Sequence, residues 1–254
     1  MNRRHRASPL LRLFAGALTA AACVPAAAID PFSQPPAERL RLYEERLADW
    51  PQLARYRESN AQIGAPARGE ARVVFLGDSI TEGWPRRAGN FFPGMPYVNR
   101  GIFGQTTPQM LLRFRADAIA LKPRAVVILA GSNDLAGKTG PSSLAMIEDN
   151  LASMTELAQA NGIKVVLASL LPVNDCVEPR TSRRSPQKIV ELNAWIKAYA
   201  QRRNSVYLDY YAALADAHGA LKKELSDDGL HPNAAGYAVM APLARHAIES
   251  ALAH

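Results

Sequence analysis

The stretch that decides the fold is Arg72-Val73-Val74-Phe75-Leu76-Gly77-Asp78-Ser79-Ile80-Thr81. Its first half is a short run of apolar and β-branched residues, which is typical of a buried β-strand. The glycine that follows permits a tight turn, and the polar residues after it then stand at the end of the strand. Because apolar residues occupy consecutive positions, both faces of this strand are expected to be buried, as they are in a parallel sheet covered by helices.

Similar apolar runs recur along the chain and alternate with longer helical patterns. The runs are Tyr97–Val98, Ala125–Leu129, Lys164–Ala168 and Val206–Leu208. The clearest helical patterns are Ser142–Asn161, Pro186–Asn204 and Asn233–Leu252, the last with a kink expected at Pro242. Strands separated by helices predict βαβ units, in which parallel strands form one sheet with helices on both faces.

The chain before the first strand has a different character. Residues 37–60 are rich in charge, and apolar side chains recur there at helical spacing: Leu40, Tyr43, Leu47 and Trp50. We expect a helical arm, broken at Trp50-Pro51, and a linker over residues 61–70. The predicted organisation is a helical arm and linker over residues 29–70, followed by a single α/β domain over residues 71–254.

The first 28 residues predict a secretory signal. They contain four arginines and no acidic residue, then an apolar run over Leu10–Ala22, and finally Ala26-Ala27-Ala28. The apolar run is too short for a convincing membrane span. We expect cleavage near Ala28 and a periplasmic or secreted mature protein. Two alternatives stay open, an unprocessed amphipathic helix and a lipid anchor on Cys23.

The composition is that of a packed globular protein. Hydrophobic residues make up 48% and charged residues 21% of the 254 residues, and the formal net charge is +7. The signal arginines account for +4, which leaves +3, and no basic stripe interleaved with aromatics indicates nucleic-acid binding. Two cysteines exclude a disulfide-dense scaffold and a four-cysteine zinc site. Cys176 is interpreted as an ordinary loop cysteine rather than a reactive thiol.

Polar and glycine-rich segments follow three of the apolar runs, at the strand ends where ligands bind in parallel sheets. Gly77-Asp78-Ser79 follows the first run, Asn99–Thr106 the second, and Gly131-Ser132-Asn133-Asp134 the third. A fourth polar segment, Asp227–Pro232, precedes the last helix. These four segments are the candidates for the functional site.

Ser79 is the candidate nucleophile. A serine needs a base, usually a histidine whose tautomer is held by a carboxylate. Of the five histidines, only His231 lies in a loop bounded by glycine and proline and three residues from an acid, Asp228. Ser79, His231 and Asp228 are therefore the candidate catalytic residues. Taken alone, residues 228–231 can also be interpreted as a solvated turn capped by Asp228.

The tetrahedral intermediate of such chemistry needs hydrogen-bond donors for its oxyanion. The candidate donors are the backbone N–H groups of Ser79 and Gly104 and the side-chain amide of Asn133. The alternatives are a left-handed loop position for Gly104 and a turn or helix cap for Asn133. Asp78 is interpreted as an organiser of its loop. This chemistry requires no metal and no organic cofactor.

The four segments together resemble the motifs of the SGNH hydrolases, also called GDSL-type esterases. The resemblance covers roughly residues 72–252. It implies that Ser79 is the nucleophile, that Asp228 and His231 are the acid and base, and that Gly104 and Asn133 belong to the oxyanion hole. The implied fold is a three-layer α/β/α sandwich with five parallel strands in flavodoxin-like order.

Two further segments, Gly101–Thr107 and Leu170-Leu171-Pro172, look most like the platelet-activating-factor acetylhydrolase-like branch of this superfamily. Gln105 departs from the pattern, because many members carry an acid at that position. The departure leaves open which hydrogen bonds organise the loop around Gly104.

The expected function is hydrolysis of an ester through an acyl-enzyme, with short, acetyl-like acyl groups on carbohydrates or lipids as the favoured substrates. One alternative is a lysophospholipase- or thioesterase-like hydrolase of longer acyl chains. Another is a non-catalytic carbohydrate-binding module on the same fold. Residues 131–139 end in Gly-Lys-Thr, but their spacing departs from that of a phosphate-binding loop, which argues against nucleotide binding.

Overall fold

The computed structural model describes residues 35–253, except for the side chains of residues 45 and 46. The predicted signal and Cys23 lie outside the described residues. The chain divides into two compact units after residue 46. Residues 47–70, which the sequence places in the arm and linker, belong to the second unit together with the sheet.

Helix α1 spans Pro36–Ala48. Proline is favoured at the start of a helix because its missing N–H would have no partner there, and Glu38 suits the positive end of the helix dipole. Glu38 also pairs with Arg41 at 2.7 Å. The helix ends before Trp50-Pro51, where the sequence predicts the break, because the residue before a proline avoids helical geometry.

Five parallel strands form one sheet in the described part of the chain, in the order β2-β1-β3-β4-β5. The strands are β1 (Val73–Gly77), β2 (Tyr97–Gly101), β3 (Ala125–Leu129), β4 (Lys164–Ala168) and β5 (Val206–Leu208). Each neighbouring pair is parallel. The prediction of five parallel strands in flavodoxin-like order is confirmed.

Strand β1 lies between β2 and β3, which is what brings the candidate segments to one place. Gly77 at the end of β1 is level with Gly101 of β2 and Leu129 of β3. The chain leaves β1 toward one neighbour and later returns on the other side of it, so the loops after these strands diverge around a crevice. The segments that follow β1, β2 and β3 therefore share the carboxyl edge of the sheet.

Strand β2 extends beyond the predicted Tyr97–Val98 and includes Asn99 and Arg100. The sequence prediction was too short because these two polar residues interrupt the apolar pattern. Because β2 is an edge strand, these side chains find polar partners beside it. The Asn99 amide donates to the Thr81 carbonyl at 2.6 Å, and Arg100 Nε donates to Asn60 Oδ1 at 2.8 Å.

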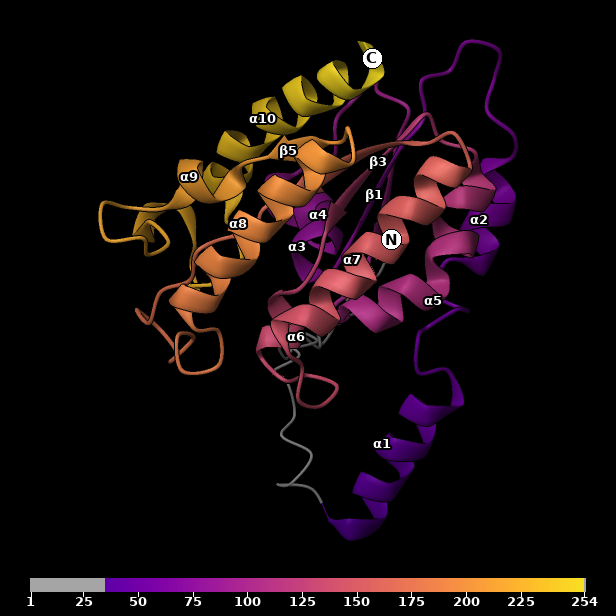
Figure 1. Ribbon diagram of the computed structural model, residues 1–254. Helices are drawn as coiled ribbons and strands as arrows, with labels where there is room; N and C mark the ends of the chain where they lie inside the picture. Colours follow the sequence, from indigo (N-terminus) through magenta and orange to yellow (C-terminus); the bar gives the residue numbers. More distant parts are fainter. Residues whose placement is uncertain (1–34, 254) are drawn as a thin grey trace, which may run out of the picture. The chain divides into compact units, whose positions relative to one another are not determined.

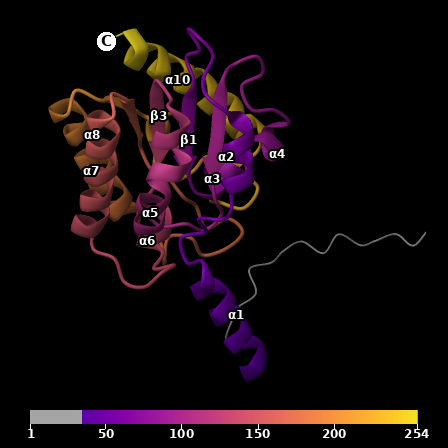
Figure 2. The same ribbon diagram turned by 90° about the vertical axis from the view of Figure 1, so that its right-hand side faces the viewer.

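Helices cover both faces of the sheet (Figures 1 and 2). Helices α5 (Thr107–Asp117), α7 (Leu144–Ala160) and α8 (Pro186–Arg202) lie on one face, and α10 (Ala234–Ala253) lies on the other. The shorter helices are α2 (Arg57–Ile63), α3 (Ser79–Glu82), α4 (Trp84–Ala88), α6 (Ser132–Leu135) and α9 (Tyr210–Leu214), with 3₁₀ turns at Ile119–Leu121 and Lys223–Leu225. The three-layer α/β/α architecture is therefore as predicted.

Two hydrophobic cores explain the unbroken apolar strands. Successive strand residues point to opposite faces of a sheet. In β1, Val74 and Leu76 join the core beneath α5, α7 and α8, whereas Val73 and Phe75 join the core beneath α10. Every residue of β1 is therefore buried, and so is every residue of β3.

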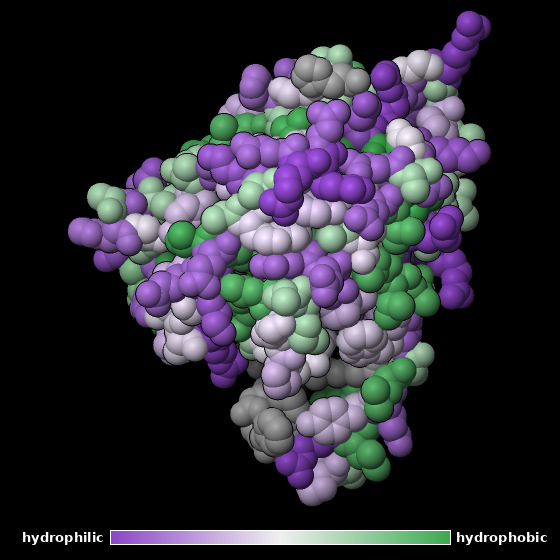
Figure 3. All heavy atoms as spheres, in the orientation of Figure 1, coloured by the Kyte–Doolittle hydropathy of each residue, from purple (hydrophilic) through white to green (hydrophobic). Residues whose placement is uncertain are grey.

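Polar side chains cover much of the face formed by α7 and α8 (Figure 3). These helices bury their apolar residues against the sheet and leave the opposite face to water. Within residues 35–253, no helix is both long enough and apolar enough to span a bilayer.

Candidate active site

Ser79 is the first residue of helix α3, directly after the turn that ends β1. Asp78 caps this helix, because its Oδ1 accepts the Ile80 N–H at 2.9 Å. From α10, the hydroxyl of Tyr237 donates to the Ile80 carbonyl at 2.6 Å. Contacts from two elements therefore hold Ser79 at the edge of the sheet, where it stays partly exposed.

The backbone around this turn is closely packed. A Cβ added at Gly101 would lie 2.1 Å from the Glu82 nitrogen and 2.7 Å from the Thr81 carbonyl carbon. A Cβ added at Gly77 would lie 2.1 Å from Thr81 Oγ1. Only glycine allows β1 and β2 to approach α3 this closely.

A tight loop before α10 holds Asp228 and His231. The Oδ1 of Asp228 accepts the N–H groups of Leu230 at 2.9 Å and of His231 at 2.7 Å. Gly229 adopts the left-handed conformation that the turn needs, with φ of 77°. Ser226 Oγ donates to the His231 carbonyl at 2.8 Å. This turn leaves the second oxygen of Asp228 facing the imidazole ring.

The three candidate catalytic side chains form one hydrogen-bonded chain. Ser79 Oγ lies 2.9 Å from Nε2 of His231, and Nδ1 of the same ring lies 2.6 Å from Oδ2 of Asp228. The His231 side chain is 12% exposed and that of Asp228 is 28% exposed. The sequence singled out these residues, and the structure brings them together.

Asp228 stays ionised in this environment. Burial raises the pKa of its carboxyl, but hydrogen bonds from the ring and backbone of His231 outweigh burial and hold the pKa well below its usual range. Arg180 adds a positive charge, with its Nη2 3.9 Å from Asp228 Oδ2 and its Nε donating to the Asp228 carbonyl at 3.2 Å. A permanent carboxylate at this position favours the His231 tautomer that carries its proton on Nδ1.

The Asn133 amide hydrogen-bonds to the loop after β1 and to the loop after β2. Its Nδ2 donates to Asp78 Oδ2 at 3.2 Å and to the Gln105 carbonyl at 3.0 Å. Its Oδ1 accepts from Arg184 at 3.2 Å, and Arg184 also donates to Ser132 Oγ at 3.0 Å. The amide is therefore buried and oriented with its hydrogens toward the site, and in this state they are shared between a carboxylate and a carbonyl.

Asp78 has the interior position that its predicted role as a loop organiser requires. Burial raises the pKa of Asp78 to about 6, although the hydrogen bond from the Ile80 N–H and the positive charges nearby oppose the rise. Asp78 therefore gains or loses a proton in weakly acidic solution while in contact with Asn133.

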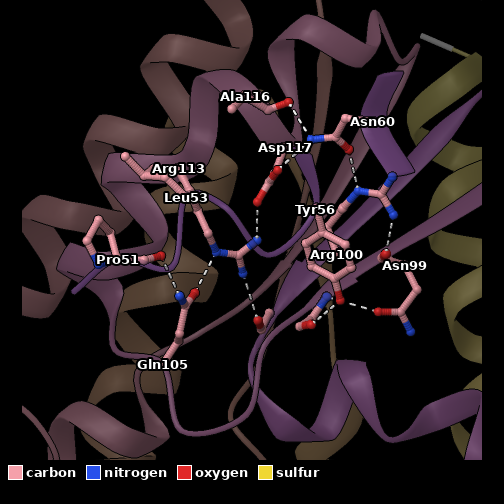
Figure 4. Close-up of polar contacts among 12 residues, drawn as sticks. Pro51, Leu53, Tyr56, Asn60, Asn99, Arg100, Gln105, Arg113, Ala116 and Asp117 are labelled. Atoms are coloured by element: carbon pink, nitrogen blue, oxygen red, sulfur yellow. Dashed lines mark hydrogen bonds and ion pairs between the residues drawn. The ribbon is translucent and has the colours of Figure 1, made fainter. Parts of the chain in front are cut away.

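Gly104 lies in the loop between β2 and α5, with φ of 74°. A Cβ at this position would meet no atom within 4 Å, so the space beside the Gly104 backbone is open. Its neighbour Gln105 is fully buried. The Gln105 amide donates to the Pro51 carbonyl at 2.8 Å, and its oxygen accepts from Arg113 (Figure 4). These two hydrogen bonds organise the loop around Gly104 in this chain.

Two arginines of the loop between β4 and α8 are functional candidates that the sequence patterns did not reveal. Arg180 contacts Asp228, and Arg184 contacts Asn133. The loop follows the carboxyl end of β4 and contains Arg180, Arg183 and Arg184 within five residues. That cluster at a strand end was the available signal, but nothing in the sequence tells which arginine turns inward.

Metal-binding side chains do not gather in the part of the chain that the structure describes, where no three His, Cys, Asp or Glu residues form a cluster that could hold an ion. Cys176 is exposed and forms no disulfide within the described residues.

Comparisons with known proteins agree with this architecture. Residues 75–239 match the GDSL-like Lipase/Acylhydrolase family. The fold is similar to the crystal structure of a GDSL-like lipase from Bacteroides thetaiotaomicron, with 45% sequence identity and a TM-score of 0.75 over 80% of this chain and 99% of that one.

Two curated relatives are more distant. The lipoprotein YqeF of Bacillus subtilis is 33% identical over 132 residues, which cover 43% of this chain and about half (52%) of that protein. An acetylxylan esterase of Geobacillus stearothermophilus is 24% identical over 198 residues, which cover 67% of this chain and 90% of that protein. Because the family match spans more than half of its length, the chain belongs to the GDSL-like lipase/acylhydrolase family of carboxylic ester hydrolases.

Proposed function

We propose that this protein hydrolyses esters through a Ser79-His231-Asp228 triad and an acyl-enzyme. The proposal rests on one observation, the continuous hydrogen-bonded chain from Ser79 Oγ through the His231 ring to Asp228, with links of 2.9 and 2.6 Å. A serine hydroxyl is a weak nucleophile, and this arrangement supplies the base and the group that orients the base.

The reaction begins when Ser79 Oγ attacks the ester carbonyl carbon. His231 Nε2 takes the hydroxyl proton, and Asp228 stabilises the imidazolium that forms. The tetrahedral intermediate then breaks its bond to the alcohol oxygen, which leaves with the proton from His231. Water attacks the Ser79 ester in the same way, with His231 again as base, and releases the carboxylic acid and free Ser79.

The proposed oxyanion hole consists of the N–H groups of Ser79 and Gly104 and the side-chain amide of Asn133. Open space beside Gly104 and the inward orientation of the Asn133 amide support this role. The Asn133 hydrogens now shared with Asp78 and the Gln105 carbonyl would turn in part toward the oxyanion, which is a stronger acceptor because of its charge.

The test is the Ser79→Ala variant, assayed on p-nitrophenyl acetate and labelled with an organophosphate. We expect turnover to fall by a factor on the order of 10⁶ and the covalent label to be lost. Ser153→Ala is the matched control, because Ser153 lies on α7 and donates only to a helix carbonyl. A folded Ser79→Ala protein with full activity would refute the proposal.

We propose short acyl esters of carbohydrates or lipids as substrates. The similarity to an acetylxylan esterase supports an acetyl group on a sugar. The test is a series of p-nitrophenyl esters from two to sixteen carbons, in which kcat/KM is expected to be highest for the shortest chains. Activity restricted to long chains would instead indicate a lysophospholipase- or thioesterase-like enzyme.

Export through the signal over residues 1–28, with a periplasmic or secreted mature protein, is also a proposal. The lipoprotein name of the Bacillus relative supports an envelope location and keeps attachment through Cys23 open. Mass spectrometry of the protein from its native host separates the outcomes. A chain that begins near Ile29 agrees with cleavage after Ala28, an acylated Cys23 indicates a lipoprotein, and an intact Met1 contradicts export by a cleaved signal.

A further inference from the structure

We infer that Gln105 is a positioning residue of the oxyanion hole and that residues 51–60 support this hole, in part through Gln105. This inference rests on the proposed function, because it concerns the two oxyanion donors Gly104 and Asn133. It assigns a role in the reaction to a segment that lies before the residues matched to the family.

Gln105 stands between the two proposed donors. Its backbone follows Gly104 directly, and its carbonyl accepts the Asn133 amide at 3.0 Å. Any shift of the Gln105 backbone therefore moves the Gly104 N–H and changes the direction of the Asn133 amide together. Donors to an oxyanion have to be held in place before the reaction, so the group that fixes both of them affects the rate.

The Gln105 side chain is anchored at both of its polar atoms (Figure 4). Nε2 donates to the Pro51 carbonyl at 2.8 Å, and Oε1 accepts from Arg113 Nε. Arg113 is itself fixed, because it pairs with Asp117 at 3.0 Å and donates to the Gly77 carbonyl at 3.1 Å. All these groups except Pro51 are buried, so an unmade hydrogen bond here is costly.

This position requires an amide rather than an acid. A glutamate at position 105 could accept from Arg113, but it has no hydrogen to donate to the Pro51 carbonyl. Its negative charge would face that carbonyl oxygen at hydrogen-bond distance, and the two would repel. Glutamine replaces the acid that many family members carry at this position, and in this chain its amide has a specific partner. That partner is the Pro51 carbonyl, in the segment that precedes β1.

A second path connects the same segment to the other side of Gly104. Arg55 pairs with Glu82 at 3.0 Å, and the other oxygen of Glu82 accepts the Phe103 N–H at 2.8 Å. Phe103 and Gln105 flank Gly104 in the sequence. Both neighbours of the proposed donor are therefore held by contacts that lead to residues 51–60.

Several side-chain contacts fix residues 51–60 against the rest of the domain. The Tyr56 hydroxyl donates to the Gly101 carbonyl, and the Arg100 guanidinium lies 4.5 Å from the centre of the Tyr56 ring. Asn60 accepts from Arg100 and donates to Asp117 Oδ1 at 2.7 Å (Figure 4). These contacts join the segment to β2 and to α5, the two elements that flank the oxyanion loop.

The experiment compares Gln105→Glu and Tyr56→Phe with the wild type in the full chain, on the p-nitrophenyl ester that the wild type hydrolyses fastest. Gln62→Glu is the matched control, since Gln62 is an exposed residue of α2 whose side chain donates to Glu58 on the same helix. The measurements are kcat and KM as functions of pH, together with the thermal unfolding midpoint.

For Gln105→Glu we expect kcat to fall about tenfold, as the loss of one well-placed hydrogen bond would produce, with KM within about twofold of the wild type. The shape of the pH profile of kcat stays unchanged, because the substitution leaves the Ser79-His231-Asp228 contacts in place. Gln62→Glu behaves as wild type. A Gln105→Glu protein with wild-type kcat overturns the inference.

If Gln105→Glu does not fold, Tyr56→Phe decides the question, because it removes one hydroxyl and keeps the ring. A lower kcat at an unchanged unfolding midpoint supports the inference, and an unchanged kcat overturns it. Failure of the proposed function is recognised separately, by activity that survives Ser79→Ala.

Discussion

Ser79 Oγ and His231 Nε2 lie 2.9 Å apart although 152 residues separate them in the chain. The first residue of α3, just after β1, supplies the hydroxyl, and the loop before α10 supplies the ring. A contact of this length positions the serine proton for transfer to Nε2, provided that the other ring nitrogen keeps its own hydrogen. Asp228 Oδ2, 2.6 Å from Nδ1, is the group that keeps it there.

Asp228→Asn is therefore expected to lower kcat by a factor on the order of 10⁴, as the same change does in serine proteases. Asn keeps an oxygen for the backbone N–H groups of Leu230 and His231 but turns its NH₂ toward Nδ1. The ring then carries its proton on Nε2, where it cannot accept one from Ser79. Steady-state kinetics check this, with Asp227→Asn, an exposed neighbour, as the control. Equal losses in both variants would contradict the assignment.

Arg184→Met is expected to reduce kcat by roughly 10- to 100-fold with little change in KM, because a hydrogen bond from a charged group contributes about 1.5–3 kcal/mol. The variant leaves Asn133 Oδ1 without its partner, so the amide is free to rotate away from the site. Arg183→Met, an exposed change one residue earlier, serves as the control. An Arg184→Met enzyme with raised KM and unchanged kcat would show that the arginine binds substrate instead.

Asp78 predicts a pH dependence of stability with a definite sign. Burial raises its folded-state pKa to about 6 from an ordinary value of 3.8, so the folded state disfavours the charged form. The favourable contribution is complete below about pH 4 and is lost as the pH rises through 6, by about 3 kcal/mol in total.

The measurement for Asp78 is urea unfolding of the wild type and of Asp78→Ser, in which serine keeps the cap on the Ile80 N–H. The stability of the wild type relative to the variant is expected to fall between pH 4 and pH 7. The opposite shift at Asp228 is present in both proteins and cancels in the comparison. A difference that is the same at both pH values would show that Asp78 does not titrate in this range.

Gly101→Ala is expected to destabilise the fold by at least about 3 kcal/mol. Ordinary overpacking costs about 1–3 kcal/mol, and this contact is with backbone atoms. The added methyl would meet the Glu82 nitrogen at 2.1 Å, and that backbone cannot move without shifting Ser79. Gly89→Ala is the control, because its space is open and only its left-handed φ of 77° opposes alanine, at about 1 kcal/mol. Thermal and urea unfolding distinguish the two, and equal losses would mean that the contact at Gly101 relaxes.

Local patterns in the sequence were enough to predict the architecture. The runs at Arg72–Leu76 and Ala125–Leu129 are apolar on both faces because helices cover both faces of the sheet. Burial of both faces can therefore be recognised from consecutive apolar residues in the sequence. The break at Trp50-Pro51 and the turn at Gly77 follow from single-residue geometry. The polar edge strand β2 was predicted too short, because its polar residues find partners in distant parts of the chain. Asn99 donates to the Thr81 backbone carbonyl, and Arg100 donates to the Asn60 side chain.

The candidate triad could also be named from the sequence, because a reactive serine, a histidine in a constrained loop and an acid three residues away leave few other choices. Tertiary structure alone decided what surrounds it. Which arginine of the β4–α8 loop turns inward, and what Gln105 bonds to, depend on side chains that pack together only when distant segments meet. Local residue preferences carry no information about such contacts, whose energies arise from burial and geometry in the folded state.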